Sequence, residues 1–205
     1  MSTNDRSGPS ERPAGKNPAK RQGHTDLRVR RTRERLGAAL IALIEEKAID
    51  EVTIREVLDR AKVGRSTFYV HYQDKEDLFL SQLEEGLQMW SNILSTKQEK
   101  SSRVAPVAEF FAHVASAKKL YRSLVGSGRI QAFFDLAQGY FARGIARRLK
   151  EIGLPIPDQR EFDARAHALA GNLLSLLRWW LDRGAKETPE DMDGLFHRMV
   201  WKGLR

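Results

Sequence analysis

Two short helical patterns separated by three residues constrain the fold of this chain more than any other feature. Thr53 can cap the first helix, and Glu56, three residues later, completes a capping box. Apolar residues at helical spacing predict this helix over 54–61, and Lys62-Val63-Gly64 predicts a tight turn after it. A second short helix is predicted over 65–72. Such a pair, braced by a preceding helix, is typical of a helix-turn-helix.

The second helix of the pair has one face for the core and other faces free to bind. Phe68 and Tyr72 lie four residues apart and share one side of a helix, which we assign to the core. Arg65 can pair with guanine through two hydrogen bonds, and a serine or threonine can contact several bases or a phosphate. The pattern therefore favours a helix whose leading turn contacts DNA bases.

The rest of the chain is also helical by its periodicity. Leu36, Leu40, Leu43 and Ile44 predict an amphipathic helix over about 30–47. Longer helices are predicted over about 75–93, 105–121, 129–152, 159–183 and 189–203. No alternating strand pattern occurs, so the predicted fold class is all-α.

The stretch from Thr53 to Leu78 resembles the DNA-binding signature of the TetR family of transcriptional regulators. Together with the preceding predicted helix, from about residue 28, the motif covers roughly a quarter of the chain. Two positions depart from the family pattern: Lys62 stands where the turn usually has Gly, and Gly64 stands where Ser or Thr usually caps the second helix. The matching residues are Thr53, Ala61, Val63, Phe68-Tyr69, His71-Tyr72 and Lys75-Glu76 before Leu78.

The resemblance implies an N-terminal three-helix helix-turn-helix domain and a C-terminal helical domain for regulation and dimerisation. Residues 1–27 are rich in Pro, Gly and Ser, and we expect a disordered basic tail there. The DNA-binding domain is expected over 28–75. An effector-binding and dimerisation domain is expected over 76–205, with 76–93 as the connecting helix.

Carried over position by position, the resemblance also implies roles in DNA binding. Base contacts in the major groove are expected from Arg65, Ser66, Thr67 and Val70. Phosphate contacts are expected from Thr53, Tyr69, His71 and Lys75, and a groove or backbone contact from Arg55. The alternatives are a solvated Arg55 and a Tyr69 that is partly in the core.

The last two predicted helices are expected to form the interface of a homodimer. Their apolar residues exceed what one chain's core would cover, and the small Ala170 and Gly171 allow helices to approach closely. The alternative is an ordinary core within one chain.

An unknown small molecule is the expected effector, because the resemblance implies a pocket in the C-terminal domain. Aromatic residues at helical spacing are more often core, so the lining residues are weakly specified by sequence. The candidates are Trp90, Phe110, Phe111, His113, Tyr121, Phe133, Phe134, Tyr140, Phe141, His167 and Trp179.

Composition excludes several kinds of chemistry. The chain has no cysteine, so disulfides, thiolate nucleophiles and Cys-type zinc sites are excluded. None of its five histidines lie three or four residues apart, so no helix carries a metal-binding His pair. We expect no cofactor, no metal and no enzymatic activity. No apolar run approaches the roughly 18–20 residues of a membrane span. The N-terminal residues lack the apolar segment of a secretory signal. We therefore expect a cytoplasmic protein with no membrane partner.

Together these features predict a sequence-specific regulator of transcription. We expect a repressor that binds double-stranded DNA at a near-palindromic operator and is released by its effector. The net charge of +8 suits a polyanionic partner. The alternatives are a DNA-binding regulator without a ligand, an all-helical enzyme with its site in the C-terminal half, and a basic surface that docks on membranes or proteins.

Overall fold

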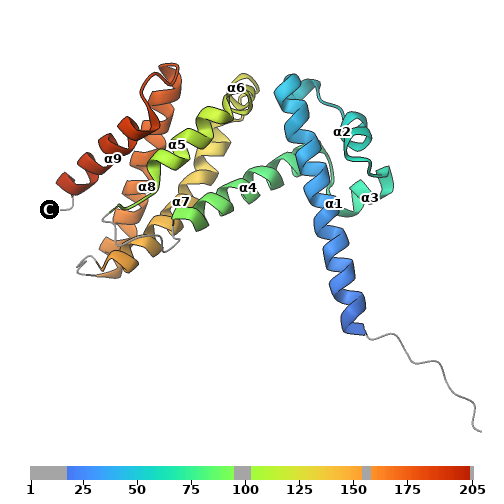
Figure 1. The fold of residues 1–205 in the computed structure, drawn as a ribbon, viewed down its shortest axis with the longest axis horizontal. Coiled ribbons are helices and arrows are strands. Elements are labelled where there is room, and N and C mark those ends of the chain that lie inside the picture. Colours follow the sequence, from blue (N-terminus) through green and yellow to red (C-terminus); the bar gives the residue numbers. More distant parts are fainter. Residues whose placement is uncertain (1–17, 95–102, 154–157, 204–205) are drawn as a thin grey trace, which may run out of the picture.

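The chain folds into helices in the part that the structure describes. This computed structural model describes residues 18–94, 103–153 and 158–203. Those ranges contain nine α-helices, one short 3-10 helix and no strand, which confirms the all-α prediction (Figure 1). In chain order they are α1 (Pro18–Glu46), η1 (Ile49–Glu51), α2 (Ile54–Ala61), α3 (Arg65–His71), α4 (Lys75–Leu94), α5 (Val107–Ser116), α6 (Lys118–Gly126), α7 (Ile130–Ile152), α8 (Gln159–Asp182) and α9 (Pro189–Gly203).

A first hydrophobic core lies between α1, α2, α3 and the start of α4, and we call it the N-terminal core. Figure 1 shows α2 and α3 on one side of the long α1, which extends beyond them. The two short helices are thus held on a longer one, as the helix-turn-helix prediction requires. The buried members of this core include Leu36, Leu40, Leu43, Ile44, Val57, Ala61, Phe68, Tyr72, Leu78, Phe79 and Leu83.

A second core, the bundle core, lies among the C-terminal helices. α7 packs against α8 and α4, and α5 packs against α9. Figure 1 shows α4 spanning the distance from α1 to this bundle. α4 therefore contributes to both cores. The buried members of the bundle core include Leu87, Trp90, Phe110, Phe111, Phe141, Leu173, Trp180 and Phe196.

The α6 helix makes a second connection between the two halves. Leu124 of α6 is buried in the N-terminal core. The neighbouring Ser123 accepts a hydrogen bond at its Oγ from the Ile49 N–H, at 3.3 Å. A shift of α6 would therefore displace the contacts of Leu124 in the N-terminal core and the hydrogen bond of Ser123 to Ile49.

Helix α1 begins earlier than the sequence predicts. It starts at Pro18, so the disorder predicted for residues 1–27 is wrong for 18–27, while residues 1–17 lie outside the described ones. Proline is tolerated in the first turn of a helix, because its missing N–H has no helical partner there. Good helix formers, among them Ala19, Lys20 and Arg21, then continue the helix.

The helix predicted over 105–121 is two helices in the structure. Ala117, with φ −99° and ψ 25°, separates α5 from α6. Its N–H is shared between the carbonyl oxygens of His113 and Val114, each at 3.1 Å. The break lets α6 turn toward α1, which it contacts. Packing overrides local helix propensity here, because Ala is itself the best helix former.

Candidate nucleic-acid interface and ligand cavity

Helix α2 begins at a complete capping box. The Thr53 Oγ1 accepts a hydrogen bond from the Glu56 N–H at 3.3 Å, and a Glu56 carboxylate oxygen accepts one from the Thr53 N–H at 2.9 Å. This confirms the predicted start of the helix. Lys47 also donates to Glu56, at 2.7 Å. The hydrogen bond from Lys47, and then those from Thr53, lower the pKa of Glu56 from 4.5 to about 2.

The turn between α2 and α3 is tight, and it uses a lysine in a conformation that favours glycine. Lys62 has φ 53° and ψ 45°, in the left-handed region. The Val63 N–H donates to the Leu58 carbonyl at 3.2 Å. Arg35 donates to the Lys62 carbonyl at 2.8 Å, which fixes the turn against α1. Gly64 caps α3 with no side-chain hydrogen bond.

One face of helix α3 packs in the N-terminal core, and its other faces are exposed. Phe68 and Tyr72 are buried in the N-terminal core, as predicted. On the other faces, Tyr69 is 48% exposed and Val70 is 77% exposed. The leading turn, which contains Arg65, Ser66 and Thr67, is exposed throughout. A helix presented in this way can enter the major groove of B-DNA.

The remaining candidates for DNA contact are Arg55 on α2 and His71 at the end of α3, and Arg65 also contacts Tyr69. Arg55 is exposed on α2, and its nearest acid in the structure is Asp59, at 3.8 Å. The Arg65 guanidinium lies 5.8 Å from the centre of the Tyr69 ring, a distance at which cation and ring attract. His71 is partly exposed at the end of α3. The roles of these residues on DNA remain predictions.

Lys75 has a different role from the one expected. Its ammonium donates to the carbonyl oxygens of Ile49 at 2.7 Å, Val52 at 2.8 Å and Asp50 at 3.4 Å. An ammonium has three N–H donors, so all three are used within the protein. The predicted phosphate contact is therefore wrong for this conformation. Lys75 instead links the start of α4, through these hydrogen bonds, to the segment that connects α1 and α2.

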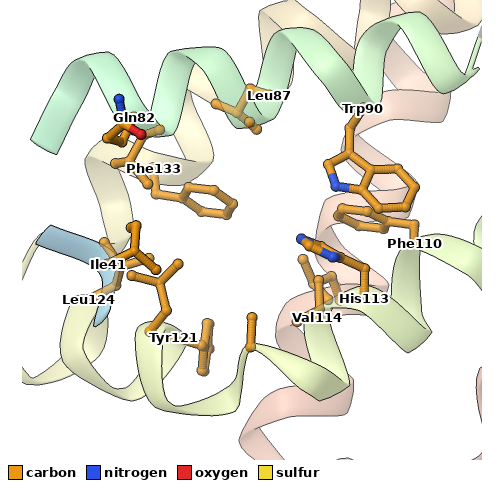
Figure 2. Close-up of a pocket in the computed structure, with 15 residues that line it drawn as sticks. Ile41, Gln82, Leu87, Trp90, Phe110, His113, Val114, Tyr121, Leu124 and Phe133 are labelled. Atoms are coloured by element: carbon orange, nitrogen blue, oxygen red, sulfur yellow. The ribbon is translucent and has the colours of Figure 1, made fainter. Parts of the chain in front are cut away.

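A cavity of about 140 Å³ lies where the two cores meet. Figure 2 shows side chains from α1, α4, α5, α6 and α7 pointing toward its centre. Five of the expected effector-binding residues line it, namely Trp90, Phe110, His113, Tyr121 and Phe133. The lining residues that were not expected are Ile41, Gln82, Leu83, Gly86, Leu87, Val114, Ala117, Leu120, Leu124 and Leu177.

The polar groups of the cavity are few, and none is an acid or a strong base. None of the lining residues carries a carboxylate, an ammonium or a guanidinium group. The Trp90 Nε1 is buried and has no hydrogen-bond partner. Burial, and then the nearby Asp182, raise the pKa of Tyr121, so this phenol stays uncharged at neutral pH. The cavity is thus mainly apolar, with a few hydrogen-bonding groups, among them the imidazole of His113.

The other six expected effector residues do not line this cavity. Phe111, Phe134 and Phe141 are buried in the bundle core. The Tyr140 ring centre lies 4.5 Å from the guanidinium carbon of Arg143. His167 and Trp179 are exposed on α8. Aromatic residues at helical spacing serve more often as core, and the three phenylalanines follow that rule.

Most of the missed lining residues are aliphatic or small. Leu83, Leu87 and Trp90 follow helical spacing on α4, so one face of that helix was visible in the sequence. The bend at Ala117 brings α6 over that face, and this bend has no signal in the sequence. Gly86 lies four residues from both Gln82 and Trp90, and a Cβ there would meet nothing within 4 Å.

Two further kinds of site are absent from the described residues. Residues 18–94, 103–153 and 158–203 contain no group of three or more His, Asp or Glu side chains placed to hold a metal ion. Those same segments include no helix with the length and apolarity needed to cross a membrane.

Known proteins resemble this chain in sequence. Residues 37–81 match the family model described as bacterial regulatory proteins, tetR family. The chain is 25% identical over 174 residues to YxbF of Bacillus subtilis (strain 168), an uncharacterized HTH-type transcriptional regulator. That match covers 80% of this chain and 42% of the relative, so the chain spans about two fifths of the relative's length.

Solved structures share the fold. DhaS, the dihydroxyacetone kinase operon activator, matches with a TM-score of 0.63 and 15% identity, over 84% of this chain and 96% of DhaS. SmeT, the repressor of the Stenotrophomonas maltophilia multidrug efflux pump SmeDEF, matches with a TM-score of 0.57 and 19% identity, over 83% of this chain and 89% of SmeT. The matched residues 37–81 contain the whole turn and both of its short helices. Residues 37–81 therefore contain a helix-turn-helix of the kind that the tetR family model describes, and the chain shares its overall fold with these solved structures.

Proposed function

We propose that this chain is a transcriptional regulator, and specifically a repressor whose dimer binds a near-palindromic operator and is released by a small-molecule effector. The observation that carries the proposal is the exposed leading turn of α3, held from behind by Phe68 and Tyr72. Two such helices related by a two-fold axis would enter successive major grooves, which lie about 34–36 Å apart on B-DNA.

The DNA contacts divide into base contacts and phosphate contacts. We assign Arg65, Ser66, Thr67 and Val70 to base edges, because they lie on the exposed leading side of α3. We assign Tyr69 and His71 to phosphates and Arg55 to the groove edge or backbone. The phosphate contact expected of Thr53 would require its hydroxyl or N–H to leave Glu56, to which they donate at 2.8 Å and 2.9 Å. Lys75 is left out of this set, because its donors bind carbonyl oxygens.

We further propose that residues 28–75 bind DNA and residues 76–205 sense the effector and dimerise, with 76–93 as the connecting helix. The shared position of α4 supports this division. Its Leu78 and Phe79 pack in the N-terminal core, whereas its Leu87 and Trp90 pack in the bundle core and line the cavity. An effector that prefers one position of α4 would change operator affinity by the same coupling factor.

The dimer is proposed to form through α8 and α9. Trp179 on α8 is 42% exposed and Met199 on α9 is 37% exposed, although both are large and apolar. These features favour a second copy of this chain as the partner of this face.

The dimer is tested by sedimentation of the full chain. Trp179→Asp combined with Met199→Asp is expected to give a monomer, because two charges would be buried without partners. The control is Met89→Asp on α4, which is 47% exposed and outside the proposed interface. A double variant that sediments like the wild type would contradict this interface.

The cavity is proposed as the effector site. Its lining from α4 and α6 places a bound molecule against the two helices that also contact the N-terminal core. SmeT, which shares the fold, has been solved as a complex with triclosan. DhaS is described as an operon activator, so activation by this chain is the alternative outcome.

Operator binding is tested by selecting genomic DNA fragments with the immobilised full chain. The recovered fragments are expected to share a near-palindromic site, with log affinity falling linearly against log salt. Measured affinity should be much weaker for a scrambled duplex of the same length. Equal affinity for every duplex would contradict sequence-specific regulation.

Effector release is tested by screening neutral small molecules against the labelled operator complex. Filling the cavity with Gly86→Leu should abolish release by any active compound, because position 86 faces open space beside Gln82 and Trp90. Operator affinity without compound should stay unchanged. If release persists in Gly86→Leu, the cavity is not the effector site, and if no compound releases DNA, the regulator without a ligand is favoured.

A further inference from the structure

The indole of Trp90 is a buried hydrogen-bond donor that the protein leaves unused. The side chain is 8% exposed, and its Nε1 has no partner in the structure. A tryptophan N–H can only donate, and buried ones usually have an acceptor. Figure 2 shows the ring nitrogen on the side that faces the cavity, near His113. An acceptor is therefore missing at a defined point of the cavity wall.

The neighbouring side chains do not supply that acceptor. Phe110 contacts the Trp90 ring edge-on at 5.2 Å between centroids, and the His113 ring lies at 5.1 Å in a tilted arrangement. His113 is exposed, whereas Trp90 is buried. The unused N–H thus lies beside an exposed side chain of the cavity lining, where a ligand oxygen could reach it.

The charge of the cavity limits what can enter. None of the lining side chains is an acid, a lysine or an arginine. The polar wall groups, among them Gln82 and Tyr121, are neutral hydrogen-bonding groups, and burial keeps the pKa of Tyr121 raised. A charged ligand would lose its hydration here, and the lining offers no acid, lysine or arginine as a counter-charge, with His113 as its one basic side chain. This disfavours ammonium ions most, because no lining group is an acid.

The size of the cavity suits a ligand of about one ring. Its volume of about 140 Å³ is close to that of an engineered apolar cavity of about 150 Å³ that binds benzene. The walls are mainly aliphatic and aromatic, from Leu83 and Leu87 on α4 to Phe133 on α7. A single six-membered ring fills such a space.

We infer that the cavity binds an uncharged, one-ring molecule whose carbonyl or ether oxygen accepts the Trp90 Nε1–H. This inference rests on the proposed function for its regulatory meaning, because it names the chemistry of the proposed effector site. The ring lies among the leucines and Phe133, and the oxygen points to the end of the cavity formed by Trp90 and His113. Operator release would then depend on one hydrogen bond in an otherwise apolar site.

The test is calorimetric titration of the full chain without DNA, using three probes of similar shape. Cyclohexanone presents a carbonyl oxygen, methylenecyclohexane replaces that oxygen with CH₂, and cyclohexanecarboxylate adds a charge. Cyclohexanone is expected to bind about tenfold more tightly than methylenecyclohexane, because only it satisfies the donor. Cyclohexanecarboxylate should not bind.

Two variants locate the effect. Trp90→Phe keeps an aromatic ring but removes the N–H, so the two neutral probes should then bind with nearly equal affinity. Trp179→Phe, on the exposed face of α8, is the matched control and should keep the tenfold preference. If Trp90→Phe does not fold, the wild-type Trp90 Nε1–H resonance decides. It should move on addition of cyclohexanone and stay in place with methylenecyclohexane.

The results separate this inference from the proposed function. Equal binding of the two neutral probes by the wild type, tighter binding of the carboxylate, or no binding of cyclohexanone would each overturn the inference. Selective binding of cyclohexanone that leaves operator affinity unchanged would support the ligand chemistry and contradict the effector role. Selective binding that also weakens operator affinity would support both.

Discussion

Arg129 holds the carboxylate of Glu76 through two hydrogen bonds, from Nε to Oε1 and from Nη2 to Oε2, each 2.9 Å long. Its Nη1 donates a third hydrogen bond to Asp50, also at 2.9 Å. Arg129 directly precedes α7, whereas Glu76 lies in the first turn of α4 and Asp50 lies in η1. One side chain of the C-terminal half therefore bridges two elements next to the N-terminal core.

Removing this bridge should loosen the connection between the two halves. Arg129→Gln is expected to lower the free energy of unfolding by about 1 kcal/mol, because paired charges that are partly exposed contribute modestly. Arg129→Lys should lose less, since it keeps the charge but not the two-pronged geometry. Urea unfolding measures both. The control is Arg160→Gln on α8, which removes the same charge from an exposed position. A loss in Arg129→Gln no larger than in this control would contradict the bridge.

Replacing Lys62 with glycine should stabilise the turn. A non-glycine residue in the left-handed region costs about 1–2 kcal/mol, and glycine removes this cost. Glycine also raises the entropy of the unfolded chain, which cancels part of the gain in stability. The expected net gain for Lys62→Gly is about 0.5–1 kcal/mol, seen as a higher Tm. Lys62→Ala removes the same charge but keeps the unfavourable φ, so it should show no gain. Equal Tm values for the two variants would contradict the strain at Lys62.

The hydrogen bonds of Glu56 predict a specific pH dependence. Its pKa is lowered from 4.5 to about 2 in the folded state, so folding favours the ionised form. This stabilising contribution is present above pH 4.5 and is lost as the pH falls toward 2. The wild type should therefore be more stable than Glu56→Gln near neutral pH, and the difference should shrink within that window. A difference that stays constant across the window would contradict the lowered pKa.

Lys75 should act on the fold and not on DNA phosphates. Lys75→Met is expected to destabilise the chain by about 1.5–3 kcal/mol, because hydrogen bonds from a charged group to three carbonyl oxygens are lost. The slope of log operator affinity against log salt should stay that of the wild type. Loss of one phosphate contact would make that slope shallower by about 0.9, and such a change would restore the phosphate role.

The helix-turn-helix could be predicted from sequence because local rules define it. The capping box of Thr53 and Glu56 and the spacing of Phe68 and Tyr72 each involve residues three or four apart. The structure places α2 and α3 at the predicted positions. The exposure of Arg65 follows from the same geometry, since the core face leaves it on the other side.

The role of Lys75 and the shape of the cavity could not be predicted in that way. The carbonyl oxygens that bind Lys75 belong to residues 49, 50 and 52, more than twenty positions earlier in the chain. The cavity depends on the bend at Ala117, which packing produces against local preference. Sequence spacing identified Trp90 and Tyr121 as aromatic candidates but carried no information on which aromatics would leave a space between them.

The most direct test of the central claim is selection of bound duplexes from a random DNA library by the wild type, Arg65→Ala and Arg160→Ala. Arg65 lies in the exposed leading turn of α3, and Arg160 is an exposed arginine on α8. The account predicts that Arg65→Ala relaxes the preference at one position in each half-site, at a cost of about 1–3 kcal/mol against the wild-type site. Arg160→Ala should select the wild-type sequence. If Arg65→Ala selected the same sequence with unchanged preference, the leading turn of α3 would not read DNA.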